Sequence, residues 1–162
     1  MNKKIKEIIP YIVIIICVVL IRTFIITPAR VDGESMENTL YNGEIVLLNK
    51  IDLKLNGLKR FDIVVFNYNK DLLIKRVIGL PGETVEYLDN ELYIDYKKVD
   101  VPFEFEETNN FKYEVPNNEY FVLGDNRDNS KDSRYFGSIK IEKIKGKVSF
   151  ILFPFKRIGK VE

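Results

Sequence analysis

The longest apolar stretch of the chain lies near its beginning, at residues 8–27. A helix over this stretch would be about 30 Å long, which matches the hydrocarbon thickness of a bilayer. Three lysines precede it, and the positive-inside rule therefore places the beginning of the chain in the cytoplasm. The pattern predicts a cytoplasmic segment at 1–7, a single transmembrane anchor at 8–27 and an extracytoplasmic domain at 28–162.

Two other interpretations of residues 8–27 are a cleaved signal peptide and a buried core helix. A signal peptide has an apolar core of about 7–15 residues, followed closely by a small-x-small cleavage site. The nearest candidate site, Thr27-Pro28-Ala29, is a marginal match and lies beyond a second apolar patch at 24–26. Arg22 is close to the end of the stretch, where its side chain can reach the membrane interface. The sequence therefore favours an uncleaved anchor.

After residue 28, short runs of branched and aromatic residues replace the long apolar stretch. Two alternating runs flank Asp89-Asn90, a pattern typical of a tight hairpin. Residues 100–118 are mixed in character and contain an acidic run, which predicts an exposed loop. Strands are predicted at 44–50, 61–66, 72–78, 83–88, 91–96, 120–123 and 147–153. We therefore expect a mostly β fold, with an antiparallel, coiled or barrel-like sheet behind one N-terminal transmembrane helix.

Composition narrows the possible functions. The 162 residues suit one modest domain plus an anchor. The formal net charge is only +1, and the part after residue 28 is slightly acidic, so nucleic acid is not an expected partner. Cys17 is the only cysteine, which excludes an internal disulfide and a cysteine metal cluster. The chain has no histidine, which excludes zinc-protease motifs and the common serine and cysteine triads.

A serine nucleophile in a chain without histidine must use an amine or a carboxylate as its base. Ser35 follows the apolar stretch in Gly33-Glu34-Ser35-Met36, although a lone serine beside glycine is more commonly a turn cap. Lys75 lies in the strand at 72–78, where burial would lower its pKa from the usual value of about 10.4. A pair of surface charges is the plainer interpretation of Lys75-Arg76. Strand neighbours point to opposite faces, however, so only one of the two would reach solvent if one face is buried.

A polar segment, Gly124–Arg134, follows the predicted strand at 120–123. A charged surface loop is the plainest interpretation. A calcium loop fails because Ser133 occupies the required glycine position and Ile139 the position of the closing glutamate. A network of Asp–Arg pairs that fixes a rigid turn suits the composition better. Such a turn could also place a hydroxyl beside an amine.

Three segments, in this order behind one anchor, resemble those of bacterial type I signal peptidases, and a single anchor is similar to the Gram-positive form. They are Gly33–Leu40 (GESMENTL), Ile74–Gly82 (IKRVIGLPG) and Gly124–Gly137 (GDNRDNSKDSRYFG). The resemblance covers nearly the whole chain, and the last segment is highly specific. It implies a serine endopeptidase at the outer face of the lipid bilayer that cleaves secreted preproteins after small-x-small sites. No metal or organic cofactor is implied.

The resemblance also implies roles for individual residues. Ser35 would be the nucleophile, Lys75 the general base, and Ser130 the hydroxyl that hydrogen-bonds and orients the lysine amine. The Ser35 N–H and the Gly33 position would form the oxyanion hole. Supporting roles fall to Asp132 and Arg134, which would hold the site together, and to Asp125 and Arg127, which would be more structural.

The family's shallow pockets for small substrate side chains match Val31, Met36, Leu40 and Ile74. One position departs from the family pattern, because Asn38 stands where relatives usually have proline. Proline would stiffen the turn after the nucleophile, so we expect Asn38 to loosen it.

Three alternatives stay open on sequence alone. A self-cleaving repressor-type peptidase also uses a serine nucleophile with a lysine base, but it requires a DNA-binding module. In this chain the predicted anchor replaces such a module. A sorting-type transpeptidase uses Cys and His, whereas Cys17 lies in the anchor. A tethered, non-catalytic β domain that binds secreted chains is disfavoured by the joint presence of Ser35, Lys75 and Ser130.

Overall fold

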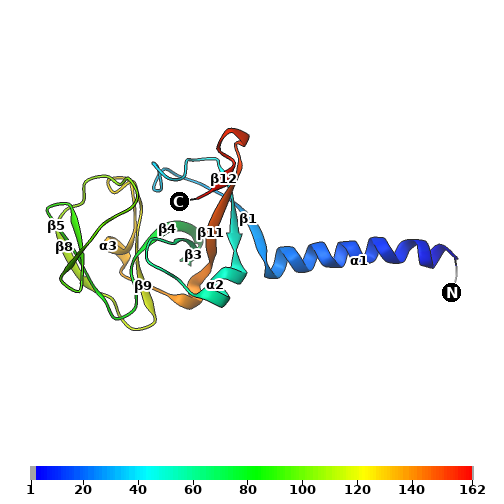
Figure 1. The fold of residues 1–162 in the computed structure, drawn as a ribbon, viewed down its shortest axis with the longest axis horizontal. Helices are drawn as coiled ribbons and strands as arrows, with labels where there is room; N and C mark the ends of the chain where they lie inside the picture. Colours follow the sequence, from blue (N-terminus) through cyan, green and yellow to red (C-terminus); the bar gives the residue numbers. More distant parts are fainter. Residues whose placement is uncertain (1–2, 162) are drawn as a thin grey trace.

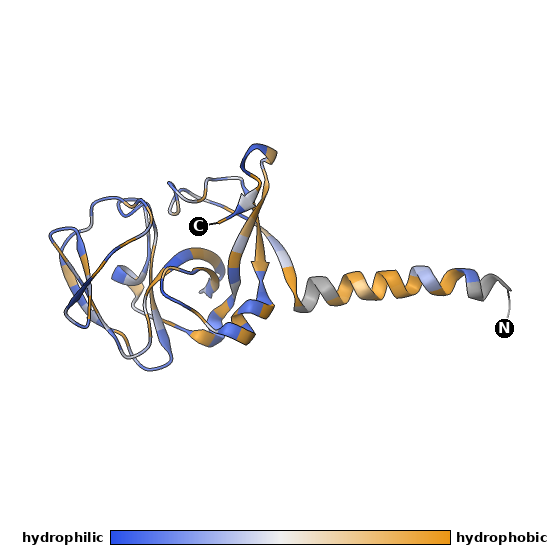
Figure 2. Cartoon of the chain, viewed as in Figure 1, coloured by the Kyte–Doolittle hydropathy of each residue, from blue (hydrophilic) through white to orange (hydrophobic). Residues whose placement is uncertain are grey.

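The computed structural model describes residues 3–161, and within helix α1 (Lys3–Phe24) it describes the side chains of residues 7–20. Helix α1 extends away from a β-rich body (Figure 1). Most of its described side chains are apolar and exposed, as the orange colouring of Figure 2 shows. In the part of the chain that the structure describes, no helix has both the length and the hydropathy needed to span a membrane.

The end of α1 differs from the predicted end of the apolar segment. Ile26 and Thr27, which lie inside the predicted anchor, belong to strand β1 (Ile26–Arg30) and pair with Asn49 and Leu48. Pro28 favours this arrangement, because a proline disfavours helical geometry in the residue before it. The β body therefore begins immediately after the helix.

Two antiparallel sheets form the body (Figure 1). The larger sheet has the order β1, β2 (Ile45–Asn49), β11 (Ile144–Phe153), β3 (Ile63–Tyr68), β4 (Asp71–Gly79), β9 (Glu119–Leu123) and β10 (Ile139–Lys140), with β12 (Gly159–Lys160) paired to β11. The smaller sheet has the order β7 (Lys97–Val99), β6 (Glu91–Ile94), β5 (Thr84–Leu88) and β8 (Phe111–Glu114). The predicted antiparallel β fold is confirmed. Within the described residues neither sheet closes on itself, so the barrel-like form is not present.

Short helical turns join the strands. They are α2 (Lys50–Asn56), α3 (Ser133–Phe136) and the 3-10 turns η1 (Ile141–Lys143) and η2 (Phe155–Arg157). Asn49 caps α2 by accepting a hydrogen bond from the Asp52 N–H, and Asp132 caps α3 in the same way through the Arg134 N–H. The second of these caps lies inside the polar segment that the sequence singled out.

The hairpin predicted around Asp89-Asn90 is present between β5 and β6. Both turn residues have positive φ, at 50° and 65°, as a two-residue hairpin turn of the primed type requires. The predicted loop at 100–118 is wrong in part. Phe103 and Phe105 pack against the core of the smaller sheet, and residues 111–114 form β8. The cause is the phenylalanines, whose burial outweighs the acidic residues between them.

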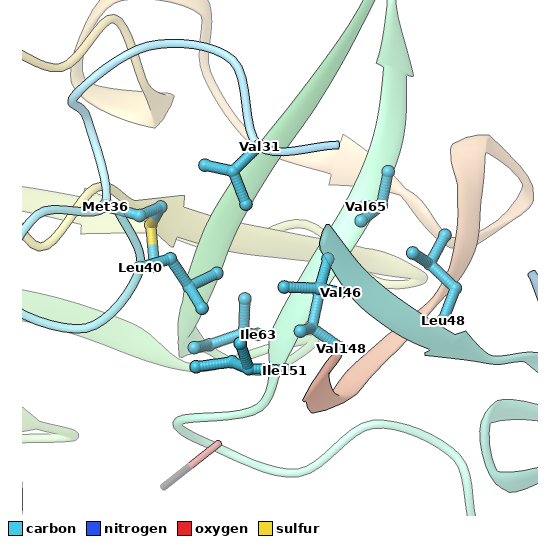
Figure 3. Packing of buried hydrophobic residues seen from close by; sticks show 9 residues of the cluster. All are labelled: Val31, Met36, Leu40, Val46, Leu48, Ile63, Val65, Val148 and Ile151. Carbon is cyan, nitrogen blue, oxygen red and sulfur yellow. The ribbon is translucent and has the colours of Figure 1, made fainter. Parts of the chain in front are cut away.

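Three apolar cores hold the sheets together. The first lies where the segment after β1 packs onto β2, β3 and β11, and Figure 3 shows its side chains converging. That segment contributes Val31, Met36 and Leu40, which are 3%, 1% and 0% exposed. Each fully buried side chain of this size contributes about 1.5–3 kcal/mol, so the segment containing Ser35 is anchored to the sheet by its neighbours.

Candidate active site

The turn around Ser35 joins β1 to β2. The N–H groups of Thr39 and Leu40 both donate to the Met36 carbonyl, at 3.0 Å and 2.7 Å, which closes a tight turn directly after the serine. Gly33 enters the turn with a φ of +96°, a region in which glycine meets no steric cost. Ser35 itself is half-buried at the surface of this turn.

Strand β4 carries Lys75 to the serine. The Lys75 Nζ lies 2.5 Å from the Ser35 Oγ and donates a hydrogen bond to it. Lys75 is only 3% exposed, and burial lowers the pKa of its amine to about 8, against the opposing effect of the Asp132 and Asp125 carboxylates. An amine with this pKa is partly neutral near neutral pH, which is the state that a general base needs.

The neighbouring Arg76 is buried as well, at 2% exposed, so the interpretation of Lys75-Arg76 as a pair of surface charges is wrong. The sheet is covered on both faces at this point. Lys75 pairs across the strands with Val64, and Arg76 pairs with Ile63 and with Leu123 of β9. Each charge therefore needs a partner inside the protein.

Arg76 forms a buried ion pair with Asp125. Its Nε and Nη2 atoms donate to the two carboxylate oxygens at 2.9 Å and 2.7 Å, and its guanidinium lies 3.8 Å from the centroid of the Phe103 ring. Thr39 completes the group, because its hydroxyl donates to Asp125 at 2.5 Å and accepts from Arg76 at 2.9 Å. The ion pair thus ties β4 and the loop after β9 to the serine turn.

Gly124 lets that loop approach the serine closely. A Cβ at this position would clash with the Ser130 side chain and with the Ser35 carbonyl oxygen. The next residue but one, Asn126, donates its N–H to that same carbonyl at 3.2 Å. The loop after β9 therefore lies directly against the Ser35 backbone, and glycine is required because no side chain fits between them.

Asp132 and Arg134 fasten the other end of this loop. The buried Asp132 carboxylate accepts from the Gly124 N–H at 3.1 Å and from the Arg134 Nε at 2.9 Å. Arg134 also donates to the Arg127 carbonyl at 2.6 Å. Arg127 in turn reaches the smaller sheet, where its guanidinium donates to the hydroxyls of Thr108 and Tyr87. These contacts match the rigid network of Asp–Arg pairs that the composition of the segment indicates.

Ser130 lies at the site, but it does not make the predicted hydrogen bond to the Lys75 amine. Its side chain is buried beside Gly124, and its Oγ has no hydrogen-bond partner among the described residues. The bond to Lys75 that we expected is therefore not formed in this structure. A buried hydroxyl without a partner is costly, so a rotation toward a polar group would be favourable.

The Ser35 N–H, the expected oxyanion donor, makes no hydrogen bond within the described residues. The Gly33 N–H is engaged by the Asn42 side chain at 3.2 Å. A backbone donor beside a nucleophile, with no internal partner, is available to a ligand. In this structure only the Ser35 half of the predicted oxyanion hole is open.

The four predicted pocket residues lie mostly inside the protein. Val31, Met36 and Leu40 are core residues, and Ile74 packs against the same core while remaining partly exposed. A hollow of about 440 Å³ adjoins Ile74, between the end of β1 and the beginning of β4. Of the four, therefore, Ile74 borders an open surface, and the other three support that surface from beneath.

Sequence reasoning gave no role to Thr39 or Gly124. The signal for Gly124 was present, because a glycine at the end of an apolar strand often marks a close approach of two backbones. The role of Thr39 had no sequence signal, since it depends on the register that places Arg76 opposite Leu123.

Comparison with known proteins places this geometry in a family. The family model described as "Signal peptidase, peptidase S26" matches residues 5–153. Signal peptidase IB of Staphylococcus aureus (strain COL) is 40% identical over 96% of this chain and 93% of its own length. Signal peptidase I of Bacillus caldolyticus is also 40% identical, over 93% of this chain and 92% of its own.

A solved structure is similar as well. The crystal structure of a signal peptidase I from Enterococcus faecalis matches with a TM-score of 0.51 and 40% identity, over 56% of this chain and 95% of that one. The chain belongs to the signal peptidase family and is a serine peptidase of the type I, Gram-positive-like group, as the three sequence segments indicated.

Proposed function

We propose that the protein is a membrane-anchored endopeptidase that cuts signal peptides from secreted preproteins with a Ser35–Lys75 dyad. Membership of the signal peptidase family supports the substrate class. The observation that carries the dyad is the 2.5 Å contact between the Lys75 Nζ and the Ser35 Oγ, made by an amine whose pKa burial lowers to about 8. The chain has no histidine to serve in place of the lysine.

In the proposed reaction, neutral Lys75 accepts the Ser35 hydroxyl proton as the Oγ attacks the scissile carbonyl carbon. The Ser35 N–H, which has no partner among the described residues, would stabilise the oxyanion of the tetrahedral intermediate. Collapse of the intermediate breaks the C–N bond, and protonated Lys75 gives its proton to the leaving amine. The lysine then deprotonates a water molecule, which attacks the acyl carbon, and as the ester C–O bond breaks the lysine returns this proton to the Ser35 Oγ.

Ser130 would orient the amine through this cycle. Its buried hydroxyl lies beside Gly124 and the Ser35 backbone and has no partner among the described residues. A modest rotation would allow it to accept a hydrogen bond from the protonated amine, which it would stabilise while the proton is held. Asp125, Arg127, Asp132 and Arg134 would act at a distance by fixing the loop.

The substrate would bind as an added strand. Strand β1 is an edge of the larger sheet, and the first half of β4 pairs with β3 alone, since β9 pairs with β4 only from Arg76 onward. The hollow that adjoins Ile74 lies between these two unpaired edges. An extended peptide could pair with either edge through backbone hydrogen bonds, and its small side chains would face the floor above Val31 and Met36.

Helix α1 would be the anchor. Its described side chains expose a nearly continuous apolar surface, with Ile8, Ile14 and Val18 between 54% and 59% exposed. Lys3, Lys4 and Lys6 favour a cytoplasmic start, with the β body outside. Because β1 begins two residues after α1 ends, the peptidase site would be held close to the bilayer surface.

The test is cleavage of a synthetic preprotein with a small-x-small site by the purified full chain, with the products identified by mass spectrometry. We expect a single cut after that site, and no cut by Ser35→Ala or Lys75→Ala. Circular dichroism should show that both variants keep the fold of the unmodified protein. Normal processing by either variant would overturn the dyad.

A further inference from the structure

The turn at the C-terminal end of the larger sheet reaches the serine segment through Arg157. This arginine is the last residue of η2, between β11 and β12. Its Nη2 donates to the Thr39 carbonyl at 2.9 Å, and its guanidinium lies 4.4 Å from the centroid of the Tyr41 ring. One side chain thus contacts two residues of the segment that follows Ser35.

The same guanidinium holds a buried carboxylate. Glu44, at the end of the serine segment, is 3% exposed, and its Oε2 accepts from the Tyr41 N–H at 3.0 Å. The Oε1 lies 2.9 Å from the Arg157 Nη1, in a charge contact that is not aligned as a hydrogen bond. Among the described residues, Arg157 is the cation paired with Glu44. A carboxylate this deeply buried needs such a partner, which fixes where the guanidinium lies.

Thr39 is therefore held from two sides. Arg76 and Asp125 bind its hydroxyl from the β4 side, and Arg157 binds its carbonyl from the C-terminal turn. Its N–H donates to the Met36 carbonyl, one residue after Ser35. If the Thr39 carbonyl moved, the turn that joins Thr39 to Met36 would move with it. The Ser35 peptide would then shift, and the distance between the Ser35 Oγ and the Lys75 Nζ would change.

We propose that Arg157 is a positioning residue for the nucleophile, which fixes the Thr39 carbonyl and thereby the place of Ser35 relative to Lys75. This inference rests on the catalytic role of Ser35 proposed above. The family model ends its match at residue 153, so motif comparison gives no indication of Arg157. The C-terminal turn then helps to position the nucleophile, although it contacts no reacting atom.

The test compares Arg157→Gln with Arg157→Lys and with Lys156→Gln in the purified full chain. Lys156 is the matched control, because it is an exposed charge in the same turn with no partner among the described residues. A displacement of about 1 Å in a catalytic group costs about 100-fold. We therefore expect kcat on the synthetic preprotein to fall about 10- to 100-fold in Arg157→Gln, with KM within about twofold. Arg157→Lys keeps the charge beside Glu44 but loses the two-armed contact, so its kcat should fall less.

A positioning role also predicts that Arg157→Gln lowers the plateau of the pH–rate profile and leaves its midpoint unchanged. The midpoint should stay the same because Arg157 contacts neither Lys75 nor its partners. A kcat in Arg157→Gln within twofold of the Lys156→Gln control, measured well below the thermal midpoint, would overturn the inference. A change confined to KM would overturn it too. Should Arg157→Gln fail to fold, the same criteria apply to Arg157→Lys and Glu44→Gln.

Ser35→Ala in the same assay separates this inference from the proposed function. Loss of cleavage in Ser35→Ala together with normal rates in the Arg157 variants would remove the positioning role alone. Cleavage by Ser35→Ala would remove both proposals.

Discussion

At the scale of single residues, the environment of Lys75 suits the proposed role of a base. A lysine in water is protonated at neutral pH and holds no lone pair for a proton. Desolvation of Lys75 works against its charge more than the Asp132 and Asp125 carboxylates work for it, so its pKa falls to about 8. On sequence alone burial was a condition for this role, and a surface charge was the plainer interpretation of Lys75. The distance to Ser35 could not be predicted, because it depends on where a distant turn docks.

Asn38 has a backbone conformation that the sequence did not indicate. The sequence suggested that asparagine, where relatives usually have proline, loosens the turn after Ser35. The structure gives Asn38 a φ of 81°, in the left-handed region that asparagine tolerates. Proline is restricted to a φ near −65°, so it could not occupy this conformation. Asn38 therefore suits a turn of a different shape.

This difference yields a prediction. Asn38→Pro should force the turn to rearrange, at a cost of about 1–3 kcal/mol in the free energy of unfolding and with a lower kcat. Asn38→Gly, the matched control, accepts the same φ and should leave kcat within about twofold. Denaturant titration and cleavage kinetics measure both effects. A proline variant as stable and as active as the unmodified chain would contradict the assigned turn geometry.

At the scale of elements, β4 and the loop after β9 build the site together. Neighbouring residues of one strand face opposite ways, so Lys75 donates to Ser35 while Arg76 binds Asp125 and Thr39 on the other face. The strands themselves were predictable from runs of branched residues. The loop at 100–118 was not, because the burial of its phenylalanines depends on Arg76 and Arg127, which stack on two of their rings.

The ion pair between Arg76 and Asp125 gives a second prediction. Asp125→Asn leaves a guanidinium that is 2% exposed without its counter-charge, which should cost about 3–5 kcal/mol in the free energy of unfolding. It also removes the carboxylate that accepts a hydrogen bond from the Thr39 hydroxyl, so kcat should fall. Asp128→Asn, an exposed carboxylate in the same loop, is the control. Equal stability of the two variants in a denaturant titration would show that the pair does not brace the loop.

At the scale of the whole molecule, the placement of the site depends on α1 and β1. The apolar pattern predicted a segment that leaves the β body, and the structure has α1 extending away from the sheets (Figure 1). The exact end of the helix was not predictable from hydropathy alone, because Ile26 is as apolar as the residues of the helix and yet pairs with β2. Pro28 favours the extended conformation of the residue before it.

The proposed anchor is tested through Cys17, the only cysteine of the chain, which lies on the apolar helix. In membranes from cells that express the full chain, a membrane-impermeant maleimide should not label Cys17, and alkaline carbonate should not release the protein. Detergent should make the thiol reactive. Efficient labelling before detergent, or release by carbonate, would contradict the bilayer location of this segment.

The most direct test of the proposed dyad compares the pH titration of the Lys75 amine with the pH dependence of the cleavage rate. The amine can be followed by NMR in the ¹⁵N-lysine-labelled full chain, with Lys75→Ala to assign its signal, and the rate by single-turnover cleavage of the preprotein. We expect both to change with a pKa of about 8, the rate rising with pH and falling about tenfold per unit well below that pKa. An amine still protonated above pH 10, in an enzyme that already cleaves at its full rate, would show that Lys75 is not the base.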